Sequence, residues 1–313
     1  MGDTERPRIA ISSCLLGVPV RYNGGHSRDR FLDDTLSQHV DWIPICPEME
    51  IGLGAPRDAL RLEDSEGGPH LVTRRTGQDH TEPMNALATS RIPRLDADGY
   101  VFKAKSPSCG VRGVTLHRGG TVVDHKHRGL FAAAVMDAHP LLPVEDEGRL
   151  HDPVLREAFV ERVFAHARLR ALLEGDWLPR DLMAFQARHK MQIMSHASYQ
   201  ETGRLAAASG TRPREPLATE YAEAFKSALT HRTSVGRHVN ALQHCLGMLD
   251  LDHVLRDDLL DVIESYRARR VALSVPMALL RHHARRAEAA YLAEQTYFRP
   301  YPDELALRNH VTP

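Results

Sequence analysis

Short apolar segments alternate with helix-like stretches over the first half of the chain, from Arg8 to about Leu142. Ile9–Ser13, Trp42–Cys46 and Tyr100–Lys103 have the composition of buried strands. Weaker extended segments are expected at 71–73, 113–116 and 121–123, and helices at 29–39, 82–90 and 129–138. Strands that alternate with helices indicate βαβ units and a mostly parallel sheet. The first half is therefore predicted to be an α/β domain of the Rossmann-like type.

The second half changes to long helical periods after Pro153, with few β-branched runs. Val239, Leu242, Leu246 and Leu249 recur at the spacing of one buried helix stripe. The acidic, glycine-containing stretch 145–149 lies between the two patterns. We therefore predict two domains, an α/β domain at 1–148 and an all-α domain at 149–313.

The composition is that of an ordinary globular protein, with 42% hydrophobic and 26% charged residues. The 40 basic residues nearly balance the 41 acidic ones, which excludes a polycation or a disordered charged tail. The longest apolar run, Leu130–Met136, is far shorter than the roughly 20 residues that a membrane span needs. Four scattered cysteines make no disulfide scaffold. These features predict a cytoplasmic protein with reduced thiols and no membrane partner.

Three of the four cysteines lie at the ends of predicted strands. Cys14 and Cys46 lie at or just after such ends, and Cys109 follows the third strand by a short loop. In an open parallel sheet, ligands bind beyond the carboxyl ends of the strands, so these thiols could converge. Thiolates suit zinc, copper(I) or an iron–sulfur cluster, although no C-x-x-C pair is present and three unrelated buried cysteines are an equal alternative. Cys245 falls beside the leucine stripe and is predicted to be a buried structural thiol.

The residues around the three cysteines carry a family resemblance. They read SSCLLG at 12–17, CPEME at 46–50 and KAKSPSCG at 103–110. In this order, and over about residues 8–145, they resemble the thiouracil desulfidase (TudS) family. The resemblance implies a [4Fe-4S] cluster held by Cys14, Cys46 and Cys109, with one iron open to a substrate sulfur. It implies a hydrolytic reaction in which water supplies oxygen to the base carbon and hydrosulfide leaves.

Two polar residues near these cysteines are candidate catalytic groups. Glu48 follows Cys46 by two positions, so its carboxylate could activate water or protonate the substrate ring. The alternative is a first-turn helix carboxylate. Ser106 matches the family's second catalytic position, with a turn-forming serine as the alternative. Ser108 is predicted to be a turn residue bonded to its own loop. Candidate outer contacts, with surface roles equally open, are Tyr22, Asn23 and Arg57.

Polar stripes in the helical half allow two interpretations. Arg188, Gln192, Ser195 and Tyr199 share one helix face, which usually means a solvated surface. The alternative is an RNA-binding face, because such side chains bind phosphate, sugar and unstacked bases. The densest basic cluster is 281–286. The candidate RNA contacts are Arg188, Lys190, Arg281, Arg285 and Arg286.

A second resemblance covers the helical half, from about Phe159 to Asn309. It includes His231–Thr233 and Tyr297–Leu305, and it is to the YbgA-like domain. A TudS-like domain followed by this domain resembles the two-domain thiouridine desulfidases (RudS type). That arrangement implies tRNA carrying 4-thiouridine as substrate and partner, without an obligate protein partner. The alternatives are a desulfidase of free thiouracil or thionucleosides, and a non-catalytic metal-containing RNA-binding protein.

Overall fold

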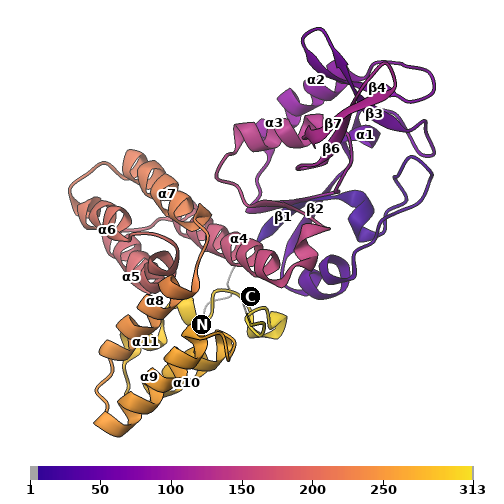
Figure 1. Ribbon diagram of the computed structural model, residues 1–313. Coiled ribbons are helices and arrows are strands. Elements are labelled where there is room, and N and C mark those ends of the chain that lie inside the picture. The colour runs from indigo at the N-terminus through magenta and orange to yellow at the C-terminus, as the bar shows by residue number, and fades with distance from the viewer. Residues whose placement is uncertain (1–5, 312–313) are drawn as a thin grey trace. The chain divides into compact units, whose positions relative to one another are not determined.

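The computed structural model describes residues 6–311, which divide into two compact units, Arg6–Leu155 and 156–311 (Figure 1). The sequence placed the boundary after residue 148, whereas the units divide after Leu155, inside the first turns of helix α4 (Pro153–Glu174). Within residues 6–311, no helix has the length and hydropathy that a membrane span requires.

The first unit contains a four-stranded parallel sheet, sheet A, with strand order β2-β1-β5-β8. The strands are β1 (Arg8–Ser12), β2 (Asp41–Ile45), β5 (Gly99–Phe102) and β8 (Val144–Asp146). Ile9 of β1 pairs with Trp42 on one side and with Gly99 on the other. The central strands β1 and β5 are buried almost throughout, as parallel strands covered on both faces are. The predicted α/β class with a mostly parallel sheet is confirmed.

A second sheet, sheet B, lies beside the first in the same unit and has the order β4-β3-β6-β7. Its strands are β3 (Leu60–Ser65), β4 (Gly68–Thr73), β6 (Val114–Arg118) and β7 (Thr121–His127). Two antiparallel hairpins, β3–β4 and β6–β7, are joined by a parallel pairing of β3 with β6. The weaker extended segments expected at 71–73, 113–116 and 121–123 therefore form a separate mixed sheet. Strands β3 and β8 were not predicted.

Three helices complete the first unit: α1 (Pro47–Glu50), α2 (Thr81–Arg91) and α3 (Leu130–Ala138). Met84 of α2 and Phe131 of α3 share one core with Tyr100 of sheet A and Leu62 of sheet B. The helix predicted at 29–39 is wrong in type. A π-helical turn, Phe31–Thr35, is followed there by a 3₁₀ turn, Leu36–Gln38, because the Leu36 N–H donates to the Phe31 carbonyl as well as to that of Leu32.

The second unit is entirely helical within the described residues, which confirms the predicted all-α class. After α4 come α5 (Pro179–His196), α6 (Gln200–Ala207), α7 (Arg214–Thr230), α8 (Val235–Gly247), α9 (His253–Arg267), α10 (Ser274–Arg286) and α11 (Ala290–Ala293). One core joins α4–α7 around Phe185 and Phe225, and another joins α8–α11 around Leu242 and Leu280. Cys245 is fully buried in the second core, as predicted for a structural thiol.

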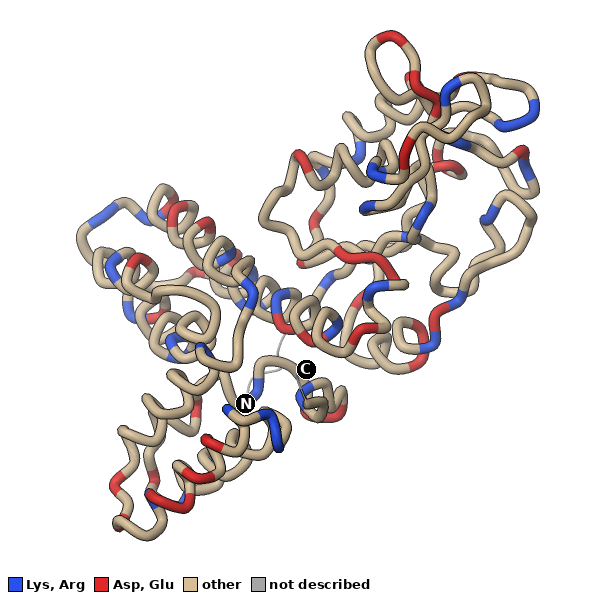
Figure 2. The backbone as a smooth tube through the Cα atoms, viewed as in Figure 1, with Lys and Arg blue, Asp and Glu red and all other residues tan. Residues whose placement is uncertain are grey.

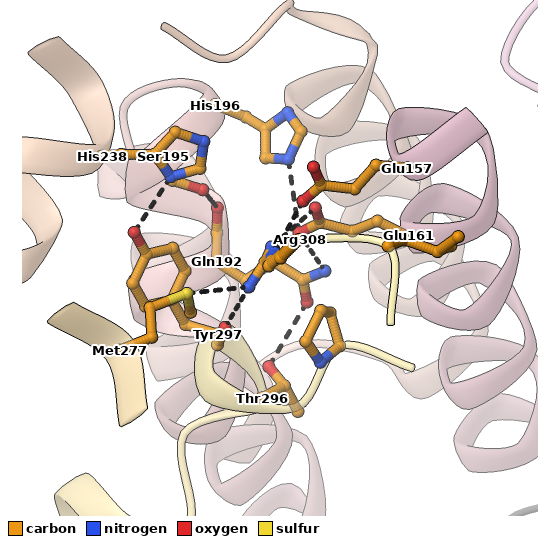
Figure 3. A network of polar contacts seen from close by, with 12 residues as sticks. Glu157, Glu161, Gln192, Ser195, His196, His238, Met277, Thr296, Tyr297 and Arg308 are labelled. Carbon is orange, nitrogen blue, oxygen red and sulfur yellow. Dashed lines mark hydrogen bonds and ion pairs between the residues drawn. The ribbon is translucent and has the colours of Figure 1, made fainter. Parts of the chain in front are cut away.

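Only one end of the polar stripe predicted on α5 faces solvent, since Arg188 is exposed, and Tyr199 lies beyond the end of the helix. Gln192 and Ser195 are fully buried and belong to a network between helices (Figure 3). Gln192 Nε2 donates to Glu161 Oε1 of α4 over 2.8 Å, and the Ser195 hydroxyl donates to the Gln192 carbonyl over 2.7 Å. Glu161 also receives Nη2 of Arg308, at 2.9 Å. The stripe therefore ties α5 to α4 and, through Arg308, to the C-terminal segment.

Candidate active site

The three cysteines of the first unit lie at one edge of sheet A. Cys46 directly follows β2, Cys14 comes just after β1, and Cys109 follows β5 by the loop 103–108. These three strands are neighbours and run parallel, so their carboxyl ends meet at the same edge. All three cysteines line one cavity of about 440 Å³. The fold therefore brings cysteines that are far apart in the sequence together in one cavity.

The three thiols are the soft ligands available in this cavity. Within residues 6–311, no three His, Cys, Asp or Glu side chains approach closely enough to hold one metal ion. A single zinc ion needs Zn–S distances of about 2.3 Å, which places its thiolates about 3.8 Å apart. A cluster binds each thiolate through a different iron and accepts them further apart. By its chemistry, this set of three soft thiols suits zinc, copper(I) or an iron–sulfur cluster.

Burial raises the pKa of all three thiols. The pKa of Cys14 rises to about 11, a shift that the nearby Lys103 ammonium opposes. The pKa of Cys46 rises to about 12, with the Glu48 carboxylate adding to the effect of burial. The pKa of Cys109 lies well above its usual value for the same two reasons. At neutral pH the three thiols are therefore protonated, and a metal that binds there displaces their protons.

Glu48 and Ser106 face each other in this cavity. Glu48 is in the first turn of the short helix α1, which matches the position of a first-turn carboxylate, but its side chain is buried. The thiol of Cys46 donates to Glu48 Oε2 over 3.6 Å, and the Ser106 hydroxyl donates to Glu48 Oε1 over 3.5 Å. A carboxylate and a hydroxyl therefore stand beside the thiols, where they can exchange a proton with a bound molecule.

Ser106 also organises the loop that carries Cys109. Its Oγ accepts the backbone N–H groups of Ser108 and Cys109, at 3.2 and 3.1 Å. Ser106 is therefore both the turn-forming serine and a cavity residue. Ser108 is a turn residue bonded to its own loop through its N–H, as predicted, but its hydroxyl is buried and finds no hydrogen-bond partner in the described part of the chain.

The start of α3 packs directly on this loop. Ala132 N–H donates to the Ser108 carbonyl over 3.0 Å, and Gly129 N–H donates to the Gly110 carbonyl over 2.7 Å. A Cβ atom at Gly129 would lie 2.5 Å from the Ser108 carbonyl carbon and 2.7 Å from the Cys109 nitrogen. This close approach requires glycine at 129. It also sets the distance between the Cys109 loop and helix α3.

Several cations line the same cavity, and most were not singled out from the sequence: Arg21, Arg57, Arg74, Lys103 and Lys105. The Lys103 ammonium pairs with the carboxylate of Glu147, just after β8, and the other oxygen of that carboxylate accepts the Ala104 N–H over 2.7 Å. The position of Lys103 within the KAKSPSCG motif was the available signal. Tyr22 also lines the cavity, whereas the Asn23 side chain accepts the Gly25 N–H in a local turn.

The five candidate RNA contacts lie on two helices of the second unit. On α5, Arg188 is exposed and the Lys190 ammonium lies 4.7 Å from the centre of the Tyr199 ring. On α10, Arg281 pairs with a carboxylate, whereas Arg285 and Arg286 are exposed. Figure 2 shows basic and acidic positions interspersed along both units.

Comparisons with known proteins match the two units separately. Residues 9–147 match the family model described as 2-thiouracil desulfurase, and residues 190–302 match a protein family of unknown function, DUF1722. The uncharacterized protein YbbK of Bacillus subtilis (strain 168) is 29% identical over 110 residues, which cover 33% of this chain and 72% of YbbK. The uncharacterized protein YbgA of Escherichia coli (strain K12) is 26% identical over 153 residues, which cover 47% of this chain and 90% of YbgA.

One solved structure was also found, described as the [4Fe-4S]-dependent thiouracil desulfidase TudS. It is 28% identical, covers 49% of this chain and 97% of its own, and has a TM-score of 0.38.

Proposed function

We propose that this chain, which joins a 2-thiouracil desulfurase domain to a DUF1722 domain, is an iron–sulfur desulfidase that converts 4-thiouridine in tRNA to uridine and releases hydrosulfide. The family model of the first unit supports the desulfidase activity. Beyond this activity, we propose a tRNA substrate and a hydrolytic reaction.

The observation that carries the proposal is the meeting of three thiols, a carboxylate and a hydroxyl in one cavity. Cys14, Cys46 and Cys109 reach it from three neighbouring strand ends, and Glu48 and Ser106 stand against them. A volume of about 440 Å³ lies in the range of small-molecule sites. The site thus has soft ligands for a metal group and a proton-transfer pair within the same space.

The donor set fits a [4Fe-4S] cluster held by Cys14, Cys46 and Cys109. When bound, such a cluster supplies a Lewis-acidic iron without a protein thiolate, which favours a soft thiocarbonyl sulfur over a carbonyl oxygen. Because burial raises the pKa of Cys14 and Cys46 to about 11 and 12, a metal group that binds there displaces the protons of these thiols.

Residues of the chain itself then activate the water and transfer the protons. The Glu48 carboxylate can accept a proton from the water that attacks the base carbon. The Ser106 hydroxyl, 3.5 Å from Glu48 Oε1, can pass a proton between this carboxylate and the heterocycle. The Lys103 ammonium, anchored by Glu147, places a positive charge beside Cys14, where anionic sulfur is stabilised.

In this proposal the helical unit holds the RNA while the first unit receives one extruded base. Extruding a base costs a few kcal/mol, which contacts elsewhere on the RNA must offset. The exposed arginines of α5 and α10 support such contacts, and the nearly neutral net charge of −1 requires them to be local.

A comparison of substrates tests the proposal. Protein reconstituted anaerobically with iron and sulfide is offered thiolated tRNA and free 4-thiouracil, and hydrosulfide is measured for both. We expect about four irons and four sulfides per chain, with a higher kcat/KM for the tRNA. A protein that takes up only zinc, or that leaves thiolated tRNA unchanged, would contradict the proposal.

The second candidate is a desulfidase of free thiouracil, which the description of the matched family favours. It requires no RNA affinity in the helical unit. Turnover of free thiouracil with thiolated tRNA left intact would select this candidate.

A further inference from the structure

The helical unit contains a second cavity, of about 220 Å³, between α10 and the C-terminal segment. One face of α10 forms a wall, with Met277 and Arg281 one turn apart. The opposite wall comes from the segment after α11, including Phe298 and Tyr301. The cavity lies wholly within this unit and is separate from the cysteine site.

The cavity walls are mainly apolar and aromatic. Phe298 and Tyr301 are buried, with 6% and 7% of their surface exposed. The thioether of Met277 and the aliphatic side chain of Leu307 also line the cavity. Aromatic rings suit a planar heterocycle, because every nucleobase has a π-face that stacks on them. The volume is too small for a large ligand, which favours a single base.

Two arginines converge on one carboxylate beside the cavity. Arg281 Nη1 lies 3.2 Å from Asp303 Oδ2, and Arg299 Nη2 lies 2.7 Å from the same oxygen. Arg281 and Asp303 line the cavity. Arg299 is not a lining residue itself, but in the sequence it lies between two that are, Phe298 and Pro300. Two positive charges therefore share one negative charge, which leaves a net positive rim that can receive a phosphate.

The second arginine that lines the cavity, Arg308, is not available for a ligand. Arg308 directs Nε to Glu157, Nη2 to Glu161 and Nη1 to the Tyr297 carbonyl, with distances of 2.6, 2.9 and 2.6 Å (Figure 3). Its guanidinium is buried and holds the C-terminal segment against α4. Arg308 thus builds the floor, while Arg281 and Arg299 supply the charge at the rim.

We infer that this cavity is a nucleotide-binding site, with the base against Phe298 and Tyr301 and the phosphate between Arg281 and Arg299. Asp303 occupies the place of the phosphate until a nucleotide binds. The nucleotide is either free or one unit of an RNA strand. The RNA form rests on the proposed function, since the strand is then the tRNA substrate.

The test compares paired variants in binding to unmodified tRNA. R281Q/R299Q removes the two rim cations, whereas R267Q/R269Q removes equal charge from exposed positions at the end of α9, in the same unit but outside the cavity lining. We expect the first pair to weaken binding about tenfold or more, because charged hydrogen bonds are lost. The second pair should weaken it less than about threefold, through the general phosphate attraction alone. Equal losses in both pairs, or none in the first, would overturn the inference.

D303N gives a prediction of opposite sign. Removal of the competing carboxylate frees both arginines, so tRNA should bind about threefold more tightly. If Asp303 only stabilised the fold, D303N would lower the melting temperature without tighter binding, and that result would overturn the inference.

Competition with UMP separates the two nucleotide sources. UMP that displaces tRNA from the wild type but not from R281Q/R299Q indicates that a free nucleotide also binds. UMP without effect, together with the loss of tRNA binding in R281Q/R299Q, assigns the site to the RNA strand. Turnover of free 4-thiouracil is measured in parallel and should stay unchanged in all these variants, so a failure of the desulfidase proposal is distinguishable from a failure of this one.

Discussion

Ser106 Oγ lies 3.5 Å from Glu48 Oε1, although 58 positions separate the two residues in the sequence. The contact joins the loop after β5 to the helix after β2, across the end of β1. Because the Ser106 hydroxyl also accepts the N–H of Cys109, the carboxylate is connected to the loop that carries a thiol. The contact with Glu48 and the position of the Cys109 loop therefore both involve the same serine.

Replacement of Glu48 by glutamine should lower turnover about 10²–10⁴-fold, because the amide cannot accept a proton from water. Iron content should stay at the wild-type level. The matched control is E50Q, whose exposed carboxylate on the same helix pairs with Arg91 at 3.6 Å. Turnover of E50Q should remain near the wild-type value, and an equal loss in both variants would argue against a catalytic role for Glu48.

Replacement of Cys14, Cys46 or Cys109 by alanine should each abolish stable iron uptake, since each thiol supplies one ligand. C245A should bind iron normally, because Cys245 is buried in the core of α8–α11. Its cost should be confined to about 1 kcal/mol of unfolding free energy. Iron and sulfide analysis after anaerobic reconstitution checks both expectations. Normal iron content in C14A would remove Cys14 from the proposed ligand set.

Alanine at Gly129 should disturb the cysteine loop without touching its side chains. The new methyl group would meet the Ser108 carbonyl carbon at 2.5 Å, so the loop or α3 must shift, at a cost of about 1–3 kcal/mol. Reconstituted iron content should fall with it. G236A, in the first turn of α8, has nothing within 4 Å of its new methyl group and should gain about 0.5–1 kcal/mol. Denaturant unfolding measures both changes, and a G129A protein as stable as wild type would show that the close approach is not required.

The helical unit should lose stability as the pH falls below about 6.5. Burial, assisted by Arg308 and opposed by Glu161, lowers the pKa of His238 to about 3. Above pH 6.5 both states are neutral; below it the unfolded chain binds a proton that the native state refuses, so unfolding is favoured. At pH 5 this amounts to about 2 kcal/mol. Burial also lowers the pKa of His166 and His189, which adds to this loss of stability at low pH. The raised pKa of Glu157 acts in the opposite direction.

H238Q isolates this contribution, because its side chain does not titrate. The difference in unfolding free energy between H238Q and wild type should shrink as the pH falls from 7 to 5. A constant difference would contradict the buried neutral histidine. The Nδ1 of His238 lies 2.9 Å from the Tyr297 hydroxyl, so H238Q should be less stable at pH 7.

The sequence predicted those elements whose local pattern and tertiary role agree. The buried strands β1 and β5, the edge strand β2 and the leucine stripe of α8 follow from their apolar residues alone. Strand β3 was missed because its sequence, LRLEDS, alternates with charged residues that sheet B leaves partly exposed. β8 has only three residues, two of them acidic and buried, and local propensity gives no signal for it.

Polar periodicity was the less informative signal. Gln192 and Ser195 share a helix face with exposed Arg188, yet they are buried, because Glu161 and the C-terminal segment approach that face from distant parts of the chain. The cavity cations were overlooked for a similar reason. Arg21 and Arg74 reach the cavity from loops whose placement depends on the whole unit.

The central claim, that the cysteine cavity replaces thiocarbonyl sulfur by oxygen in tRNA, is tested most directly by isotope labelling. Thiolated tRNA is incubated with the reconstituted protein in water enriched in oxygen-18, digested to nucleosides and analysed by mass spectrometry. The account predicts loss of 4-thiouridine, an equal gain of uridine carrying one oxygen-18 atom, and one hydrosulfide for each, all absent in C14A. Unchanged 4-thiouridine in the presence of a fully assembled cluster would contradict it.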